Sequence, residues 1–134
     1  LIDNMTVYDN VSMPLKMIGI KDKNEIKTRV DYILERDGIY RYRHRVCSML
    51  SGGERQRVGI ARALVKNPNI ILADEPTGNL DSKNGQDVMN LLKELNQEGT
   101  TIIMVTHSQH DAAFATRTIC LFDGKIVTDV KNRL

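Results

Sequence analysis

Residues 50–57 decide how the rest of the chain is interpreted, and they read Leu50-Ser51-Gly52-Gly53-Glu54-Arg55-Gln56-Arg57. Glu54 follows Ser51 by three residues, which is the spacing of a capping box at the start of a helix. Each glycine in a helix costs about 1 kcal/mol relative to alanine, so a pair is unfavourable if capping is its only task. Glycine also lets the backbone approach a ligand closely, and a helix start with free N–H groups binds anions. The stretch therefore predicts either an ordinary capped helix or a helix start that faces phosphate.

Composition limits the class of protein. The chain has 134 residues, 41% of them hydrophobic, and a formal net charge of +2, so it can form one core and carries no charge excess that would indicate a nucleic-acid partner. Cys47 and Cys120 lie far apart without the spacing of metal ligands, which indicates reduced thiols. No apolar run approaches the length of a membrane span, and no signal peptide is visible. The first residue is Leu1, so we expect the gene product to begin earlier.

The region before the glycines reads as helical. Apolar residues at helical spacing predict a helix over residues 6–17, in which Pro14 is expected to cause a kink or an end, and a second helix over residues 24–35. Residues 40–45 alternate tyrosine with basic side chains. A solvated connector is the favoured interpretation of this segment, while a nucleic-acid patch or a protein contact surface are the alternatives.

An α/β pattern follows the glycines. The helix that starts there is predicted to stop at Asn67-Pro68. An apolar run at residues 70–76 predicts a strand that is buried on both faces of a parallel sheet, and the run at residues 101–106 predicts a second buried strand. A helix is predicted between them over residues 83–97, capped by Asp81 or Ser82. We also predict a short helix over residues 111–116 and a hairpin of residues 119–122 and 125–128.

Titratable side chains follow both predicted strands. Asp74 and Glu75 end the first strand, and His107 follows the second. Ligands of open α/β sheets bind at the carboxyl ends of the strands, and adjacent carboxylates there are costly unless a cation or a reaction uses them. A solvated acidic turn is the alternative for either carboxylate alone. Together with the glycine-rich helix start, these groups predict hydrolysis of a nucleoside triphosphate with Mg²⁺.

One expected part of such a site does not occur in the sequence. No stretch matches the phosphate-binding loop G-x-x-x-x-G-K-[ST]. Without this loop and its lysine, the chain has no evident cradle for the β- and γ-phosphates. We therefore expect the chain to complement a phosphate site and not to build one alone.

Residues 50–107 resemble the ATPase subunit of ATP-binding cassette (ABC) transporters. Residues 50–54 resemble the signature motif of the family, residues 70–74 the Walker B strand, and His107 the switch histidine. The D-loop is represented by Gly78, Asn79, Leu80 and Asp81. These motifs occur in the order and spacing of the family. The sequence of residues 73–81 is most similar to that of the subgroup that serves lipoprotein release, macrolide-type efflux and cell division.

The resemblance implies roles for single residues. Glu75 is implied to be the catalytic glutamate, Asp74 to hold Mg²⁺ through water, and His107 to contact the γ-phosphate of ATP. The signature residues implied to contact a nucleotide held by the opposite subunit are Leu50, Ser51, Gly52, Gly53 and Glu54. ATP and Mg²⁺ are the implied cofactors, and the full-length protein is implied to be an ATP hydrolase.

The resemblance also implies an architecture and partners. The expected fold class is α/β, a partial P-loop NTPase (RecA-like) core with parallel strands and a C-terminal hairpin, preceded by a helical subdomain. Residues 1–49 are expected to form that subdomain, and residues 50–134 the C-terminal part of the ATPase core. The Walker A loop of the family would precede Leu1. The implied partners are a second ATPase subunit, as a homodimer, and membrane-spanning permease subunits, without nucleic acid, at the cytoplasmic face of the cell membrane.

Two alternatives to the transporter ATPase stay open. One is a soluble ABC ATPase of DNA repair or translation, although residues 1–50 show no long coiled-coil insertion of the repair type. The other is an inactive or self-associating fragment, which the missing phosphate loop supports. Such a fragment is expected to leave a strand edge or an apolar face uncovered.

Overall fold

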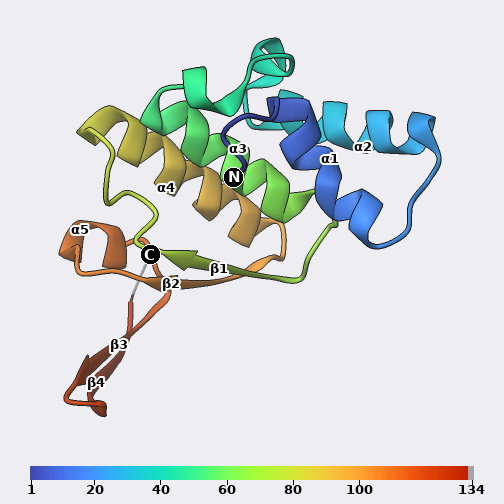
Figure 1. The fold of residues 1–134 in the computed structure, drawn as a ribbon. Coiled ribbons are helices and arrows are strands. Elements are labelled where there is room, and N and C mark those ends of the chain that lie inside the picture. Colours follow the sequence, from blue (N-terminus) through green and yellow to red (C-terminus); the bar gives the residue numbers. More distant parts are fainter. Residues whose placement is uncertain (133–134) are drawn as a thin grey trace.

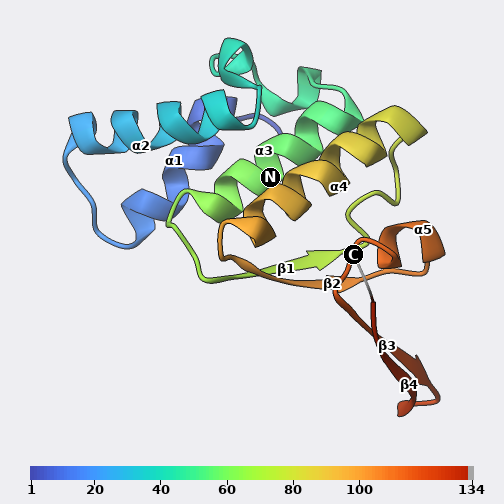
Figure 2. The same cartoon turned by 180° about the vertical axis from the view of Figure 1, so that it is seen from behind.

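The structure is a computed structural model that describes residues 1–132. Its elements in chain order are α1 (Val7–Met17), α2 (Lys23–Arg36), η1 (Tyr40–Tyr42), η2 (Cys47–Met49), α3 (Gly52–Leu64), β1 (Ile70–Asp74), α4 (Ser82–Gln97), β2 (Thr101–Val105), α5 (Gln109–Ala112), β3 (Arg117–Phe122) and β4 (Lys125–Lys131). Figures 1 and 2 show α3 and α4 side by side over one face of the β1–β2 sheet, with α1 and α2 beyond α3. The β3–β4 hairpin projects away from the helices. No helix of the described residues is long and apolar enough to cross a membrane.

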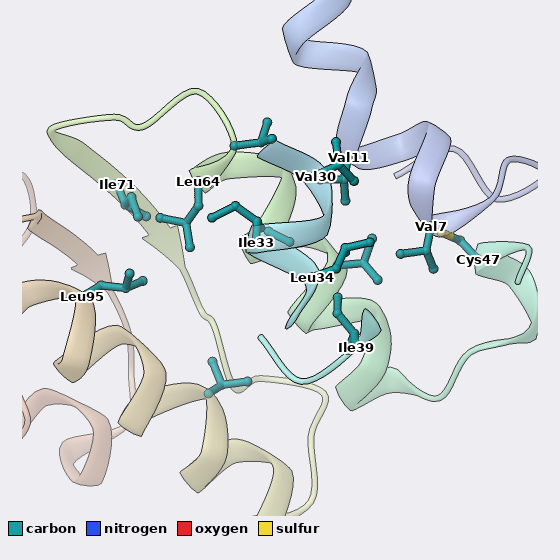
Figure 3. Packing of buried hydrophobic residues seen from close by; sticks show 14 of the residues in the cluster. Val7, Val11, Val30, Ile33, Leu34, Ile39, Cys47, Leu64, Ile71 and Leu95 are labelled. Carbon is teal, nitrogen blue, oxygen red and sulfur yellow. The ribbon is translucent and has the colours of Figure 1, made fainter. Parts of the chain in front are cut away.

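The helical part has one apolar core that reaches the sheet. Side chains from α1, α2 and α3 meet there, and Figure 3 shows Val11 and Val30 beside each other, with Leu34 and Ile39 nearby. Ile71 extends the same cluster into β1. Burying one such aliphatic side chain contributes about 1.5–3 kcal/mol. Pro14 lies inside α1, which continues to Met17, so of the two expected effects, a kink or an end, the proline does not cause the end.

The β1–β2 sheet is parallel, and its register pairs Ile70 with Thr101 and Asp74 with Val105. The predictions that the first strand is buried on both faces and that the second strand is buried are wrong. Ile71 is 8% exposed, whereas the next residue, Leu72, is 76% exposed. Successive side chains of a strand point to opposite faces, and α3 and α4 cover only one of them. The described sheet therefore has an apolar outer face that lies open to solvent.

The last elements differ from their predicted boundaries. The short helix α5 begins at Gln109 and not at residue 111, because Ser108 caps it by accepting a hydrogen bond from the N–H of Asp111 at 3.1 Å. The hairpin is confirmed and is longer than predicted. Its turn at Asp123-Gly124 has φ values of +48° and +73°, the backbone of a tight hairpin turn.

Residues 40–45 are anchored more firmly than the solvated connector that we expected. Tyr40 is half-buried, and the guanidinium of Arg43 lies 4.2 Å from the centroid of its ring. The carbonyl of Arg43 also accepts a hydrogen bond from the N–H of Tyr8 at 2.9 Å. The segment thus supplies carbonyl acceptors to N–H groups in the first turn of α1, which have no acceptor within the helix itself.

Asp37, at the end of α2, is a buried carboxylate that lacks, within the described part of the chain, the hydrogen bond that buried polar groups normally have. It is 5% exposed, and neither carboxylate oxygen has a hydrogen-bond partner among the described residues. Burial raises the pKa of Asp37 to about 7, against the opposing attraction of Arg36 and Arg57. At pH values between the ordinary pKa of 3.8 and the raised pKa of about 7, Asp37 keeps a proton in the folded chain that it has released in the unfolded chain.

This proton predicts a pH dependence of stability. Because the folded state binds more protons, the free energy of unfolding should fall as the pH rises through the interval between the two pKa values of Asp37. We expect the Asp37→Asn variant to lose this contribution, so that the change between pH 5 and pH 8 differs from wild type by on the order of 2 kcal/mol. Urea unfolding at both pH values measures it. Asp123→Asn, in the exposed hairpin turn, is the control, and an identical pH dependence in Asp37→Asn and wild type would contradict the prediction.

Candidate functional site

The first part of the candidate site is the backbone at the end of β1. Glu75 leaves the strand with φ of +47°, a left-handed conformation that a non-glycine residue rarely adopts. Its N–H still donates to the carbonyl of Val105 at 2.8 Å, and its own carbonyl accepts from the N–H of Gly78 at 3.1 Å. The second bond closes a four-residue turn with Pro76 in its second position, where proline is favoured. Backbone strain of this kind costs about 1–3 kcal/mol and clusters at functional sites.

The turn places Glu75 beside His107, which follows the neighbouring strand. The Oε1 atom of Glu75 accepts a hydrogen bond from the backbone N–H of His107 at 3.0 Å and lies 3.7 Å from its Nε2 atom. The side chain of His107 is 97% exposed, and that of Glu75 is 38% exposed. A carboxylate and an imidazole therefore stand together at the sheet edge, in reach of a ligand from solvent.

Asp74 offers a second carboxylate at the same strand end, and it is exposed. Within residues 1–132, no three His, Cys, Asp or Glu side chains are placed to hold a metal ion together. Mg²⁺ commonly takes one or two protein carboxylates and completes its shell with phosphate oxygens and water. These donors fit a Mg²⁺ ion that arrives with a nucleotide, and they do not fit a metal site built from the protein alone.

The start of α3 confirms the predicted capping box. The N–H of Glu54 donates to Oγ of Ser51 at 3.3 Å, and Oε1 of Glu54 accepts from the N–H of Ser51 at 2.9 Å. The backbone hydrogen bond from Ser51 lowers the pKa of Glu54. In the described chain, the N–H groups of Gly52 and Gly53 have no hydrogen-bond acceptor. The box thus starts the helix and leaves two donors for another group.

Gly53 has a further reason to be glycine that the sequence did not reveal. A Cβ atom at Gly53 would lie 2.7 Å from Cγ and Oδ1 of Asn84, which is too close. Asn84 in turn donates from Nδ2 to Oδ1 of Asp81 at 2.5 Å. At Gly52 a Cβ atom would lie 3.6 Å from Cδ2 of Leu80. The start of α3 therefore packs directly against the predicted D-loop of its own chain.

The structure divides the predicted site residues into two groups. Glu75 and His107 touch each other, with Asp74 at the same strand end, and residues 50–54 pack against residues 78–81. No hydrogen bond or ion pair among the described residues joins the signature stretch to Glu75 or His107. Asn84 was missed, although its position three residues after the N-cap residue Asp81 was a usable signal.

Comparison with known proteins identifies the family. The family model described as "ABC transporter" matches residues 1–78, which is more than half of the chain. The chain belongs to the ABC transporter family. It is 50% identical over 127 residues to the uncharacterized ABC transporter ATP-binding protein MJ1508 of Methanocaldococcus jannaschii, over 95% of this chain and 56% of that protein. It is 45% identical over 129 residues to the macrolide export ATP-binding/permease protein MacB of Chlorobium luteolum, over 96% of this chain and 19% of that protein.

Solved structures confirm the fold class. The dimeric, post-hydrolysis ATP-binding cassette MJ0796 bound to ADP and Pi matches with a TM-score of 0.86 and 42% identity, over 99% of this chain and 59% of that one. The predicted α/β core with parallel strands and a C-terminal hairpin is therefore that of an ABC ATPase cassette. The chain spans somewhat more than half the length of MJ1508 and MJ0796.

Two glycines of α3 test the close packing at the signature stretch. Gly53→Ala should lower the free energy of unfolding by about 1–3 kcal/mol, because the added methyl overpacks against Asn84. Gly59→Ala, in the same helix, should raise it by about 0.5–1 kcal/mol, because a Cβ there meets nothing within 4 Å and alanine favours the helix. Urea unfolding of both variants measures the difference. Two substitutions with the same sign and size would contradict the packing argument.

Proposed function

We propose that this chain contributes the signature helix, the Walker B strand, the D-loop and the switch histidine to an ATPase that powers transport across a membrane. The observation that supports it most is the contact of Glu75 with His107, in which one carboxylate oxygen lies 3.0 Å from the backbone nitrogen of the histidine. Family membership supplies the reaction class, because the matched cassette MJ0796 is bound to ADP and Pi.

Each site residue has a separate role in the proposed hydrolysis of ATP. In the proposal, Glu75 polarises the attacking water as a general base, and the bond from the N–H of His107 holds its carboxylate in place. The exposed imidazole of His107 would donate to the γ-phosphate, and Asp74 would hold Mg²⁺ through water. Bound Mg²⁺ supplies charge neutralisation of the phosphates. Positioning and charge stabilisation are the main needs of phosphoryl transfer, and in the proposal these three residues supply part of both.

The signature stretch is proposed to act on a nucleotide of a second subunit. Its residues Ser51, Gly52 and Gly53 present an anion-binding helix start, while the part of the chain that the structure describes has no hydrogen bond from this stretch to Glu75. The dimeric state of the cassette MJ0796 supports a homodimer. Residues 1–49 are proposed as the helical subdomain and residues 50–134 as part of the ATPase core.

A membrane permease is the proposed second partner. MacB carries ATP-binding and permease functions in its name, and FtsE of Streptococcus pneumoniae is a cell division ATP-binding protein. We place the docking surface on the helical region, including residues 40–45, whose tyrosine and arginine side chains form exposed and half-buried cation–π pairs. The proposed location is the cytoplasmic face of the cell membrane.

Substitution of the proposed general base tests the assignment. In the full-length gene product, Glu75→Gln should lower kcat for ATP at least about 100-fold while ATP binding is retained, because the amide cannot accept the proton of water. Steady-state ATPase assays and nucleotide titration measure the two quantities. Glu94→Gln, an exposed change on α4, is the matched control. Near-normal turnover of Glu75→Gln would refute the proposed role.

A second candidate, a self-associating fragment, is supported by the outer face of the β1–β2 sheet. Leu72 there is 76% exposed, with Ile70, Ile103 and Val105 each more than half exposed. Large contiguous apolar patches on a soluble surface mark interaction sites or aggregation. The chain studied alone would then associate through this face and show no ATPase activity.

Charge placed on this face tests the association. We expect the 134-residue chain to sediment as oligomers whose size grows with concentration, and Leu72→Lys to shift it toward monomer, because the buried lysine would be desolvated. Gln97→Lys, at the exposed end of α4, adds the same charge elsewhere and should not change the distribution. A compact wild-type monomer across the concentration range would contradict this candidate.

A further inference from the structure

Asp111 on α5 is a buried carboxylate that the proposed function does not use. It is 4% exposed and lies three residues after Ser108, the N-cap residue of α5. This spacing predicts a capping box, in which the carboxylate of Asp111 would reach back to the N–H of Ser108. Only half of the box forms, because that N–H donates instead to Oγ1 of Thr106 at 2.9 Å. The carboxylate of Asp111 is therefore available to a distant partner.

That partner is Thr77, in the loop after β1. Oγ1 of Thr77 donates a hydrogen bond to Oδ2 of Asp111. A buried carboxylate is unfavourable unless it is hydrogen-bonded, so this bond accounts for the burial of Asp111. With only four residues, α5 has little stability of its own, which means that its position depends on such tertiary contacts.

Thr77 joins three elements through the two branches of its side chain. Its hydroxyl bonds to Asp111 on α5, and its methyl branch faces α4 at Gly85, where a Cβ atom would lie 3.5 Å from Cβ and 3.6 Å from Cγ2 of Thr77. The same residue is the third position of the turn that begins at Glu75 and is closed by the N–H of Gly78. A shift of Thr77 therefore moves the turn that carries Glu75.

We propose that the Thr77–Asp111 hydrogen bond is a clamp that fixes the Glu75 turn relative to the loop of His107. Thr77 lies two residues after Glu75, and Asp111 lies four residues after His107. The clamp and the bond from His107 N–H to Glu75 Oε1, at 3.0 Å, join the segment after β1 to the segment after β2 at two points, one at His107 and one on α5. Thr77 and Asp111 are positioning residues, since neither touches the reacting atoms, and their role rests on the proposed function.

Two substitutions at Thr77 separate the hydroxyl from the packing. Thr77→Val keeps the branch that faces Gly85 and removes the donor, whereas Thr77→Ser keeps the hydroxyl and removes the methyl. In the full-length gene product, Thr77→Val should lower kcat for ATP about tenfold with KM unchanged within about twofold, and Thr77→Ser should retain kcat within about twofold. Equal losses in both variants, or no loss in Thr77→Val, would overturn the clamp.

A double-mutant cycle tests whether the two residues act through their bond. Asp111→Leu removes the acceptor, and Thr77→Val in that background should cause no further loss of kcat beyond about twofold. Independent, multiplying losses would overturn the pairing. This readout requires that the wild-type protein hydrolyses ATP and that Glu75→Gln abolishes hydrolysis, so failure of these two conditions would refute the proposed function itself.

Amide hydrogen exchange, measured without nucleotide, tests the clamp independently of ATP hydrolysis. In the full-length gene product, Thr77→Val should accelerate exchange of the His107 amide at least about fivefold, while the core amides of Val11 and Val58 stay within about twofold. Thr77→Ser should leave all three amides near their wild-type rates. An unchanged exchange rate at His107 would overturn the clamp. Equal acceleration of all three amides would also overturn it, because general destabilisation produces that result. Both conclusions hold even if ATP hydrolysis and the Glu75→Gln result are as proposed.

Discussion

The candidate site depends on the parallel pairing of β1 with β2. The register that pairs Asp74 with Val105 brings the two strand ends level, and the N–H of Glu75 continues the ladder by one bond to Val105 at 2.8 Å. His107 then returns a bond to the Glu75 carboxylate. A slip of one residue would turn every side chain of the strand to the opposite face, so the site requires this register. Because parallel strands need a crossover, α4 is part of the same requirement.

A second constraint is the close approach of helices behind that edge. Gly53 faces Asn84 at a distance that admits no Cβ atom, so the start of α3 meets the start of α4, and Gly52 lies against Leu80 in the loop before α4. Figures 1 and 2 show both helices lying along the same face of the sheet. The glycines thus combine close packing inside the chain with two N–H groups that have no acceptor within residues 1–132. This arrangement places residues 50–54 next to residues 78–81, the proposed signature motif and D-loop, in a family that includes the dimeric cassette MJ0796.

Two buried carboxylates, Asp37 and Asp111, differ in their hydrogen bonding. Asp111 is 4% exposed and bonded to Thr77, whereas Asp37 is 5% exposed and has no partner within the described residues. Burial without a bond raises the pKa of Asp37 to about 7, so this carboxyl can hold its proton in the fold. The buried carboxylate of Asp111 instead accepts a hydrogen bond from Thr77 and so links α5 to the loop after β1, close in sequence to Glu75 and His107.

The sequence by itself determined the local elements, the capping box of Ser51 and Glu54, and the acidic and histidine residues at the strand ends, because these signals lie within a few residues of each other. The order of the motifs also determined the family. Only the tertiary structure decided which strand face is open and which side chains from distant parts of the chain meet. The His107–Glu75 and Thr77–Asp111 bonds span 32 and 34 residues, and such contacts depend on how the strands and helices pack, which no local pattern encodes.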